Sequence, residues 1–298
     1  MEKTPFKSVI IMGYGDIGQR VAQLWLAEGA AVYGLARSKV AEESLQAPGL
    51  VCLQADLDGP VKLNELPLAD SLLYWFVPPP PRGQTDPRMQ NLLTALDVAG
   101  KPARIVAIST SGIYGDQQGK LVCEDTPPNP QVDRARRRLD MERQLQSWGE
   151  RHGGLPVITL RVGGIYGPNR LPLQRIRDGV PVLAEALAPK TNRIHADDLA
   201  RVCLAAALKP TGSRIYNVSD GQEANMTEYF FTLADFFALP RPPVVDWAEA
   251  ERTISPGMLS YLRESRRLDT RRMQQELGVA LQYPSLLDGL QAMRQGKQ

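Results

Sequence analysis

A glycine-rich turn near the N-terminus is the first segment whose residue types predict chemistry. The apolar run from Ser8 to Met12 leads into the hexapeptide Gly13-Tyr14-Gly15-Asp16-Ile17-Gly18, which opens a segment with helical spacing. In such a GxGxxG turn the first glycine permits the tight turn, the second admits a pyrophosphate, and the third lets helix pack on strand. Free amides at the helix start bind the phosphates, and Asp16 is expected to cap the helix. The turn therefore predicts a dinucleotide-binding site.

The end of the next apolar run indicates which dinucleotide is bound. An NAD site usually carries an acidic residue about 20 residues after the glycines, to accept the ribose hydroxyls. Here the chain reads Leu35-Ala36-Arg37-Ser38-Lys39. The Arg37 guanidinium would pair with a 2′-phosphate and Ser38 would add a contact, although an ordinary loop arginine would look the same. We therefore expect NADP rather than NAD.

Two later strand ends are expected to complete this site. Asp56 and Leu57 follow the third apolar run, where the carboxylate could accept from an adenine amino group, although a turn aspartate is the simpler alternative. Val77 and Pro78 end the fourth run and begin a stretch of four prolines. Because proline forces the chain out of the sheet, these residues are expected to form a wall of the site.

The elements that must position these residues repeat in a regular order in the first half of the chain. Short apolar runs alternate with helical spacing, which predicts βαβ units and an α/β, Rossmann-type doubly wound parallel sheet. We expect residues 1–165 to form the dinucleotide-binding domain, with elements returning from about 190–220, and residues 166–298 to form mainly a smaller C-terminal substrate lobe. The expected strands are Ser8 to Met12, Ala31 to Leu35, Leu50 to Gln54, Ser71 to Val77, Arg104 to Ser109 and Val157 to Arg161.

Composition excludes several classes of protein. The 298 residues carry 35 Lys plus Arg against 33 Asp plus Glu, a formal charge of +2, so no global bias points to nucleic acid. The longest apolar runs fall short of the ~20 residues of a membrane span, and no signal-peptide core is visible, so a cytoplasmic protein is expected. Three scattered cysteines and two histidines predict neither a disulfide framework nor a metal site.

Four further segments resemble the extended branch of the short-chain dehydrogenase/reductase superfamily, which holds NAD(P)-dependent nucleotide-sugar epimerases and dehydratases. The resemblance spans nearly the whole chain. The usual GxxGxxG is replaced by GxGxxG, with Met12 in the first place, as in an atypical subgroup labelled nucleoside-diphosphate-sugar epimerases. The matching segments are Ser109-Thr110-Ser111-Gly112-Ile113-Tyr114-Gly115, Leu160-Arg161-Val162-Gly163-Gly164-Ile165-Tyr166-Gly167-Pro168, Arg193-Ile194-His195-Ala196-Asp197-Asp198-Leu199 and Tyr216-Asn217-Val218-Ser219-Asp220.

The sequence departs from the family at its catalytic pair. The family's Tyr-x-x-x-Lys should fall some twenty residues after Tyr114, where this chain has Arg134-Ala135-Arg136-Arg137-Arg138. Arg134 would stand at the tyrosine position, and a guanidinium that stays protonated is no general acid or base. Arg138 at the lysine position could still hold the nicotinamide ribose.

The resemblance suggests other residues for the chemistry. Thr110 or Ser111 would polarise a substrate carbonyl, as the family's Ser/Thr does at this place. Tyr114 is the first candidate for a replacement acid, although a core or substrate-packing tyrosine is the simpler interpretation. Five residues on the family's substrate-side segments would meet a substrate phosphate, with structural ion pairs or packing as the alternative: Arg161, Asn169, Arg170, Arg193 and His195.

Two classes of function remain open. The first is an NAD(P)-dependent epimerase, dehydratase or reductase that acts on a nucleotide sugar or similar small carbonyl substrate. The second is a non-catalytic NADP(H)-binding sensor or regulatory protein, which the loss of both tyrosine and lysine would favour. The family also implies a homodimer through helices near 87–99 and 134–148.

Overall fold

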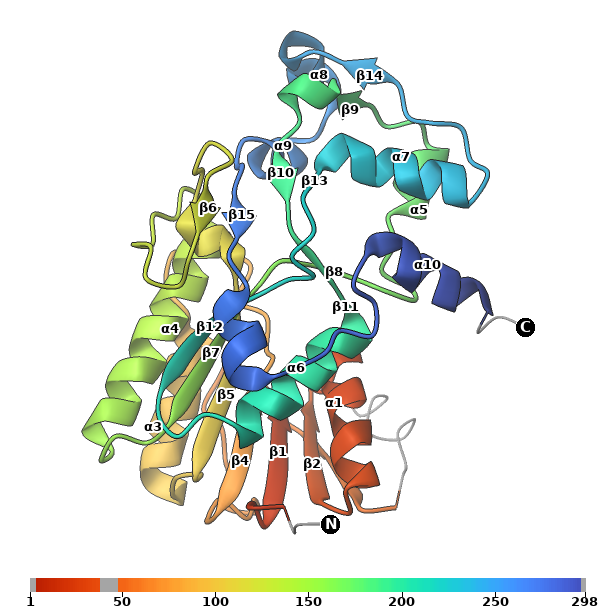
Figure 1. Ribbon diagram of the computed structural model, residues 1–298. Coiled ribbons are helices and arrows are strands. Elements are labelled where there is room, and N and C mark those ends of the chain that lie inside the picture. The colour runs from red at the N-terminus through yellow and green to blue at the C-terminus, as the bar shows by residue number, and fades with distance from the viewer. Residues whose placement is uncertain (1–3, 38–47, 296–298) are drawn as a thin grey trace.

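The computed structural model describes residues 4–37 and 48–295, and within them seven parallel strands form one sheet (Figure 1). The strand order is β12-β7-β5-β4-β1-β2-β3. Because the order reverses between β1 and β4, the sheet is doubly wound with its switch point there. This confirms the predicted fold class. The strands are β1 Ser8–Met12, β2 Ala31–Ala36, β3 Leu50–Gln54, β4 Ser71–Trp75, β5 Arg104–Thr110, β7 Val157–Val162 and β12 Arg214–Val218.

Helices cover both faces of the sheet, because successive side chains of a strand point to opposite faces and both sets are apolar in the central strands. Ile11 and Tyr74 belong to one buried cluster with α1 (Asp16–Ala27) and α6 (Ala196–Leu208). Ile10 and Trp75 belong to the other, with α3 (Pro87–Ala99) and α4 (Asp133–Arg151). Each fully buried side chain of this kind contributes about 1.5–3 kcal/mol. Two-sided burial therefore explains why the runs are apolar throughout rather than alternating.

The remaining elements lie mostly beyond the carboxyl ends of the sheet strands, at the top of Figure 1. Four two-stranded pairs, β11 with β8, β14 with β9, β15 with β6 and antiparallel β10 with β13, tie these segments together. A separate apolar cluster around Phe230, Leu233 and Ile176 packs α7 against α5. The elements are η1 Ser111–Tyr114, β6 Leu121–Val122, β8 Gly164–Tyr166, α5 Leu173–Arg177, β9 Val182–Leu183, η2 Glu185–Leu187, β10 Lys190–Thr191, β11 Arg193–His195, β13 Ala224–Asn225, α7 Met226–Phe236, β14 Val244–Val245, α8 Trp247–Thr253, α9 Pro256–Leu262, β15 Arg267–Leu268, η3 Met273–Leu277 and α10 Leu286–Gln295.

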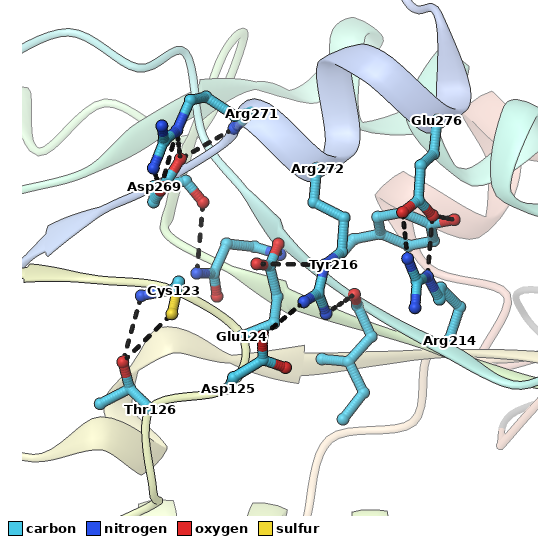
Figure 2. Close-up of polar contacts among 12 residues, drawn as sticks. Cys123, Glu124, Asp125, Thr126, Arg214, Tyr216, Asp269, Arg271, Arg272 and Glu276 are labelled. Atoms are coloured by element: carbon cyan, nitrogen blue, oxygen red, sulfur yellow. Dashed lines mark hydrogen bonds and ion pairs between the residues drawn. The ribbon is translucent and has the colours of Figure 1, made fainter.

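Polar contacts fasten the C-terminal segment to the edge of the sheet (Figure 2). Arg214 of β12 pairs with Glu276 of η3, whose carboxylate also accepts from the Tyr216 hydroxyl at 2.9 Å. Arg272 donates to Asp125 at 2.8 Å. The segment between β15 and η3 is therefore held against the sheet domain, and the residues just before it are carried to the carboxyl ends of the strands.

Across the described ranges, no helix combines the length and the apolar character that crossing a bilayer requires.

Candidate functional site

The three glycines of the N-terminal turn differ in what surrounds them. Gly13 has φ +92°, and a Cβ there would lie 2.8 Å from the Phe76 carbonyl carbon and the Val77 amide nitrogen. A Cβ on Gly18 would lie 2.8 Å from the Gly13 carbonyl oxygen, whereas one on Gly15 would meet nothing within 4 Å. Packing therefore requires Gly13 and Gly18, while Gly15 leaves open space at the start of α1.

A cavity of about 310 Å³ opens beside this turn, and we call it the turn cavity. It lies at the carboxyl ends of β1 to β4, where a doubly wound sheet binds its ligand. Most of the residues expected at the cofactor reach it, but Ile17 and Gly18 are buried in packing, and Ser38 lies outside the described residues. The expected residues that line it are Gly13, Tyr14, Gly15, Arg37, Asp56, Leu57, Val77 and Pro78.

An ion pair in the turn cavity was not expected from the sequence. Arg88, at the start of α3, donates to both carboxylate oxygens of Asp58 at 2.5 and 2.8 Å and to the Pro78 carbonyl at 2.9 Å. The Arg88 hydrogen bonds hold the pKa of Asp58 below its usual value. The two residues are far apart in sequence, so no local sequence pattern predicts that they pair.

Asp16 is the first residue of α1 rather than its cap, since Gly15 occupies the capping position and offers no side chain. This corrects the expected capping role. Its carboxylate is instead paired with Arg20, at 2.9 Å, and with Arg170. Burial acts to raise the pKa of Asp16, but hydrogen bonds from Arg170 and Arg20 outweigh it and lower the pKa. The negative charge that would repel a pyrophosphate is therefore compensated locally.

A second cavity of about 470 Å³, the arginine cavity, lies between η1, the first turns of α4 and the C-terminal segment. It brings together Thr110 and Ser111 with the two arginines at the family's tyrosine and lysine positions. Its polar and charged lining residues are Thr110, Ser111, Arg134, Arg138, Arg170, Lys190, Thr191, Asn192, Arg193, Tyr261, Glu264 and Arg266.

Arg138 connects the two cavities. It lines the arginine cavity, and its Nη1 donates to the carbonyl of Val77, a lining residue of the turn cavity, at 2.9 Å. Burial lowers the pKa of Arg138 to about 10, a value at which the group remains charged at neutral pH. A ligand that spans both cavities would pass this guanidinium.

Tyr114 does not reach either cavity, contrary to the expectation of a replacement acid. Its side chain is fully buried; the hydroxyl donates to Asn217 at 2.8 Å and accepts from Arg161 at 3.0 Å. Burial raises the pKa of Tyr114 to about 12. Tyr166, the other phenol on a matched motif, is 1% exposed and donates to the Ser285 carbonyl. Tyr114 is thus a core residue, the simpler of the two interpretations.

Arg161 is likewise a structural residue. Its Nη2 lies 2.9 Å from Glu142 Oε2, with the two side chains only 5% and 6% exposed, and Nη1 also donates to the Glu124 carbonyl. The guanidinium is held by these partners and lines neither the turn cavity nor the arginine cavity, so its position does not support the expected contact with a substrate phosphate.

His195 and Asn169 are also displaced from the expected substrate site. His195 is 1% exposed and caps α6, with Nδ1 accepting from the Asp197 amide at 3.2 Å; burial lowers its pKa. Asn169 occupies an exposed turn at φ +63° and lines neither cavity. Of the five expected substrate-side residues, Arg170 and Arg193 line the arginine cavity.

Glu264 is a lining residue that sequence reasoning missed. Its Oε2 accepts from both terminal nitrogens of Arg266, at 3.0 and 2.9 Å. Oε1 is buried and has no hydrogen-bond partner among the described residues, and burial raises the pKa of this carboxyl. No motif surrounds it; only the return of the C-terminal segment to the sheet places it there.

No group of three or more His, Cys, Asp or Glu within residues 4–37 and 48–295 is arranged to hold a metal ion.

Comparison with known proteins finds a family match for part of the chain and relatives that span nearly all of it. Residues 88–219 match the NAD dependent epimerase/dehydratase family. Protein YeeZ of Escherichia coli (strain K12) is 26% identical over 94% of this chain and 98% of its own length. The solved structure of a functionally unknown conserved protein from Silicibacter pomeroyi DSS has a TM-score of 0.81 at 27% identity, covering 98% of this chain and 99% of that one.

A second solved structure extends the likeness of fold to an enzyme. UDP-glucuronic acid 4-epimerase from Bacillus cereus, in complex with NAD, has a TM-score of 0.77 at 18% identity and covers 97% of this chain and 99% of its own. The resemblance drawn from the sequence motifs is confirmed over residues 88–219, which match the NAD dependent epimerase/dehydratase family.

Proposed function

We propose that the protein binds NADP(H) and transfers hydride to or from a nucleotide sugar or a similar small carbonyl compound. One observation carries this proposal: Arg138, which lines the arginine cavity, donates to the carbonyl of Val77, which lines the turn cavity at the switch point of the sheet. A dinucleotide extended along this path would bring its far end beside Thr110 and Ser111. In this proposal residues 1–165 supply the cofactor half and residues 166–298 most of the substrate half.

The residues present fit NADP. Open space at Gly15 admits a pyrophosphate to the amides at the start of α1. Arg37, exposed on the wall of the turn cavity, would pair with the 2′-phosphate. Arg138 would hold the ribose hydroxyls near the nicotinamide, which when bound supplies or accepts the hydride. Ser111 or Thr110 would then donate a hydrogen bond to the substrate carbonyl.

Proton exchange needs a group other than the missing tyrosine. Arg134 cannot serve, because a guanidinium does not release its proton near neutral pH. We assign this step to Glu264, whose Oε1 has no hydrogen-bond partner in the described part of the chain and whose carboxyl lines the same cavity as Ser111. Burial raises the pKa of the Glu264 carboxyl, which favours its protonated form and so its use as a proton donor.

A non-catalytic NADP(H) sensor is the second candidate, favoured by the arginine at position 134 and the burial of Tyr114. A sensor would be expected to fill the substrate pocket with side chains. The arginine cavity instead stays open at about 470 Å³ with a polar lining, which favours an enzyme.

The test is a search for NADPH oxidation and NADP⁺ reduction with a panel of nucleotide sugars and small carbonyl compounds. An enzyme turns over at least one of them, and Glu264→Gln lowers that rate while leaving the affinity for NADP⁺ unchanged. Tight NADP⁺ binding without turnover on the whole panel would favour the sensor. We also propose a cytoplasmic homodimer through α3, where Val98 is 83% exposed, and α4; light scattering would test the dimer.

A further inference from the structure

The arginine cavity carries a large excess of positive charge. Within the part of the chain that the structure describes, one acidic residue lines it, Glu264, and it is paired with Arg266. Arg170 is paired with Asp16. The cationic residues of the lining are Arg134, Arg138, Arg170, Lys190, Arg193 and Arg266.

Four of these cations have no carboxylate within 4.0 Å among the described residues. Arg134 donates to the Ser260 hydroxyl and Arg138 to the Val77 carbonyl, both neutral acceptors. Arg193 contacts the Met226 sulfur at 3.6 Å. No ion pair is formed by Lys190 within those residues. Four cations that form no ion pair with a described residue surround one cavity and repel one another, although the charges of Asp86 and Glu142 act on Arg138 and that of Asp220 acts on Arg193. An anion that enters the cavity would therefore stabilise the arrangement.

Arg193 is the clearest example of a cation that forms no ion pair within the described ranges. Its guanidinium carbon lies 3.2 Å from the centroid of the Tyr229 ring, and its buried Nε has no hydrogen-bond partner among residues 4–37 and 48–295. Burial lowers the pKa of Arg193 to about 10. A cation in such surroundings adds little to the stability of the folded protein. Its N–H groups can form charge-assisted hydrogen bonds with a ligand.

These charges lie at the expected reaction centre rather than at a distance from it. Arg134 is on the first turn of α4, and a Cβ on Gly112 would lie 3.7 Å from that of Ala135. The first turn of α4 therefore packs directly on the Thr110–Ser111 segment. A neutral sugar ring in this place would leave the charge of Arg134 balanced only by Glu264, which is already paired with Arg266.

We propose, resting on the function proposed above, that the part of the substrate beside Ser111 itself carries a negative charge, a carboxylate or a phosphate bound by Arg134, Lys190 and Arg193. The substrate class is thus an anionic carbonyl or hydroxyl compound, or a nucleotide sugar whose sugar is acidic. Planar guanidinium groups bind either oxyanion through two parallel hydrogen bonds.

The experiment is calorimetric titration of inorganic phosphate and of malonate into the protein, with and without saturating NADP⁺, at constant ionic strength in chloride. The proposal predicts that at least one anion binds with NADP⁺ present, which occupies the turn cavity. Phosphate alone indicates a phosphoryl group in the natural substrate, and malonate alone a carboxylate. Arg134→Gln is expected to weaken binding about tenfold or more, the value of one charge-assisted hydrogen bond.

Two further variants make the result specific. Arg136→Gln removes the same charge from a half-buried residue of the same helix that is paired with Asp133 and lines neither cavity, and it should bind like wild type. Lys190→Gln changes an exposed side chain, so it tests the site without disturbing the core, and it should weaken binding.

Each outcome is decisive. No anion binding in any arm, or equal binding by wild type and Arg134→Gln, overturns the proposal. Cofactor binding without anion binding overturns this inference alone, whereas anion binding without binding of either dinucleotide contradicts the proposed function and leaves the anion site standing.

Discussion

The guanidinium carbon of Arg134 lies 3.6 Å from the centroid of the Tyr261 ring. Arg134 belongs to α4 of the sheet domain, and Tyr261 to α9 in the C-terminal half. A cation over an aromatic face is attracted by the ring, and a hydrogen bond to Ser260 at 2.7 Å fixes the guanidinium further. The residue at the family's tyrosine position is therefore held by the lobe that should bind the substrate.

Substitutions at two glycines of the turn should have different effects, one on the affinity for NADP⁺ and the other on the stability of the fold. Gly15→Ala places a methyl group in open space at an ordinary φ of −91°, so its thermal stability should match wild type within about 0.5 kcal/mol. Its affinity for NADP⁺ should fall at least about tenfold, because the methyl group occupies the approach of the pyrophosphate. Unchanged affinity by calorimetry would show that no phosphate lies there.

Gly13→Ala is the matched comparison for that experiment. At φ +92° and 2.8 Å from the Phe76 and Val77 backbone, the new methyl group must shift a strand end. We expect a destabilised protein by denaturant unfolding, and a fully stable variant would contradict the close approach of β1 and β4.

Arg161 should be essential for stability and dispensable for ligands. Arg161→Met leaves the Glu142 carboxylate buried without its partner, which costs about 3–5 kcal/mol of unfolding free energy. The double variant Arg161→Met with Glu142→Leu should recover much of this loss. A stable Arg161→Met protein that loses ligand affinity would show that Arg161 binds the ligand and is not a structural residue.

Tyr114→Phe should behave as a core substitution. It removes one hydroxyl that donates to Asn217 and accepts from Arg161, so unfolding free energy should fall by about 1–3 kcal/mol. Turnover on any substrate found should be retained. A folded Phe variant with no turnover and normal cofactor affinity would restore Tyr114 as a proton donor.

Asp220 should make stability fall as pH rises. Burial raises its pKa from 3.8 to about 6, against the hydrogen bond from Gln222 and the charge of Arg193. The native state therefore holds this proton more tightly than the unfolded chain, so the contribution is present below about pH 4 and lost as pH rises through 6. Relative to wild type, Asp220→Asn should gain up to about 3 kcal/mol between pH 4 and 7.

The control for this pH series is Asp178→Asn, which removes the same charge at an exposed position. Its stability difference from wild type should stay nearly constant over the same range. A flat difference for Asp220→Asn as well would show that this carboxyl titrates normally.

The sheet and the glycine turn could be predicted because their signals are local. The run from Ser8 to Met12 coincides with β1, and the helix expected after it begins at Asp16. Periodic burial and a glycine forced by φ or by close packing are both visible within a few residues of sequence.

The arginine cavity could be predicted only in part. Thr110, Arg134 and Arg138 followed from motif spacing, but whether Arg161 faced a ligand or Glu142 depended on a pairing between a strand and a distant helix position. Glu264 could not be found at all, since it reaches the cavity through contacts such as Arg272 with Asp125, which hold the C-terminal segment to the sheet. Ion-pair partners of this kind are set by tertiary structure rather than by local pattern.

The most direct test of the account is calorimetric titration of NADP⁺ and NAD⁺ into the wild-type protein and into Arg37→Gln, with Arg82→Gln, which changes an exposed arginine outside both cavities, as the control. We expect NADP⁺ to bind about tenfold or more tightly than NAD⁺, a preference that Arg37→Gln loses and Arg82→Gln keeps. Failure of both dinucleotides to bind, or tighter binding of NAD⁺, would contradict the claim that the protein is an NADP-binding protein.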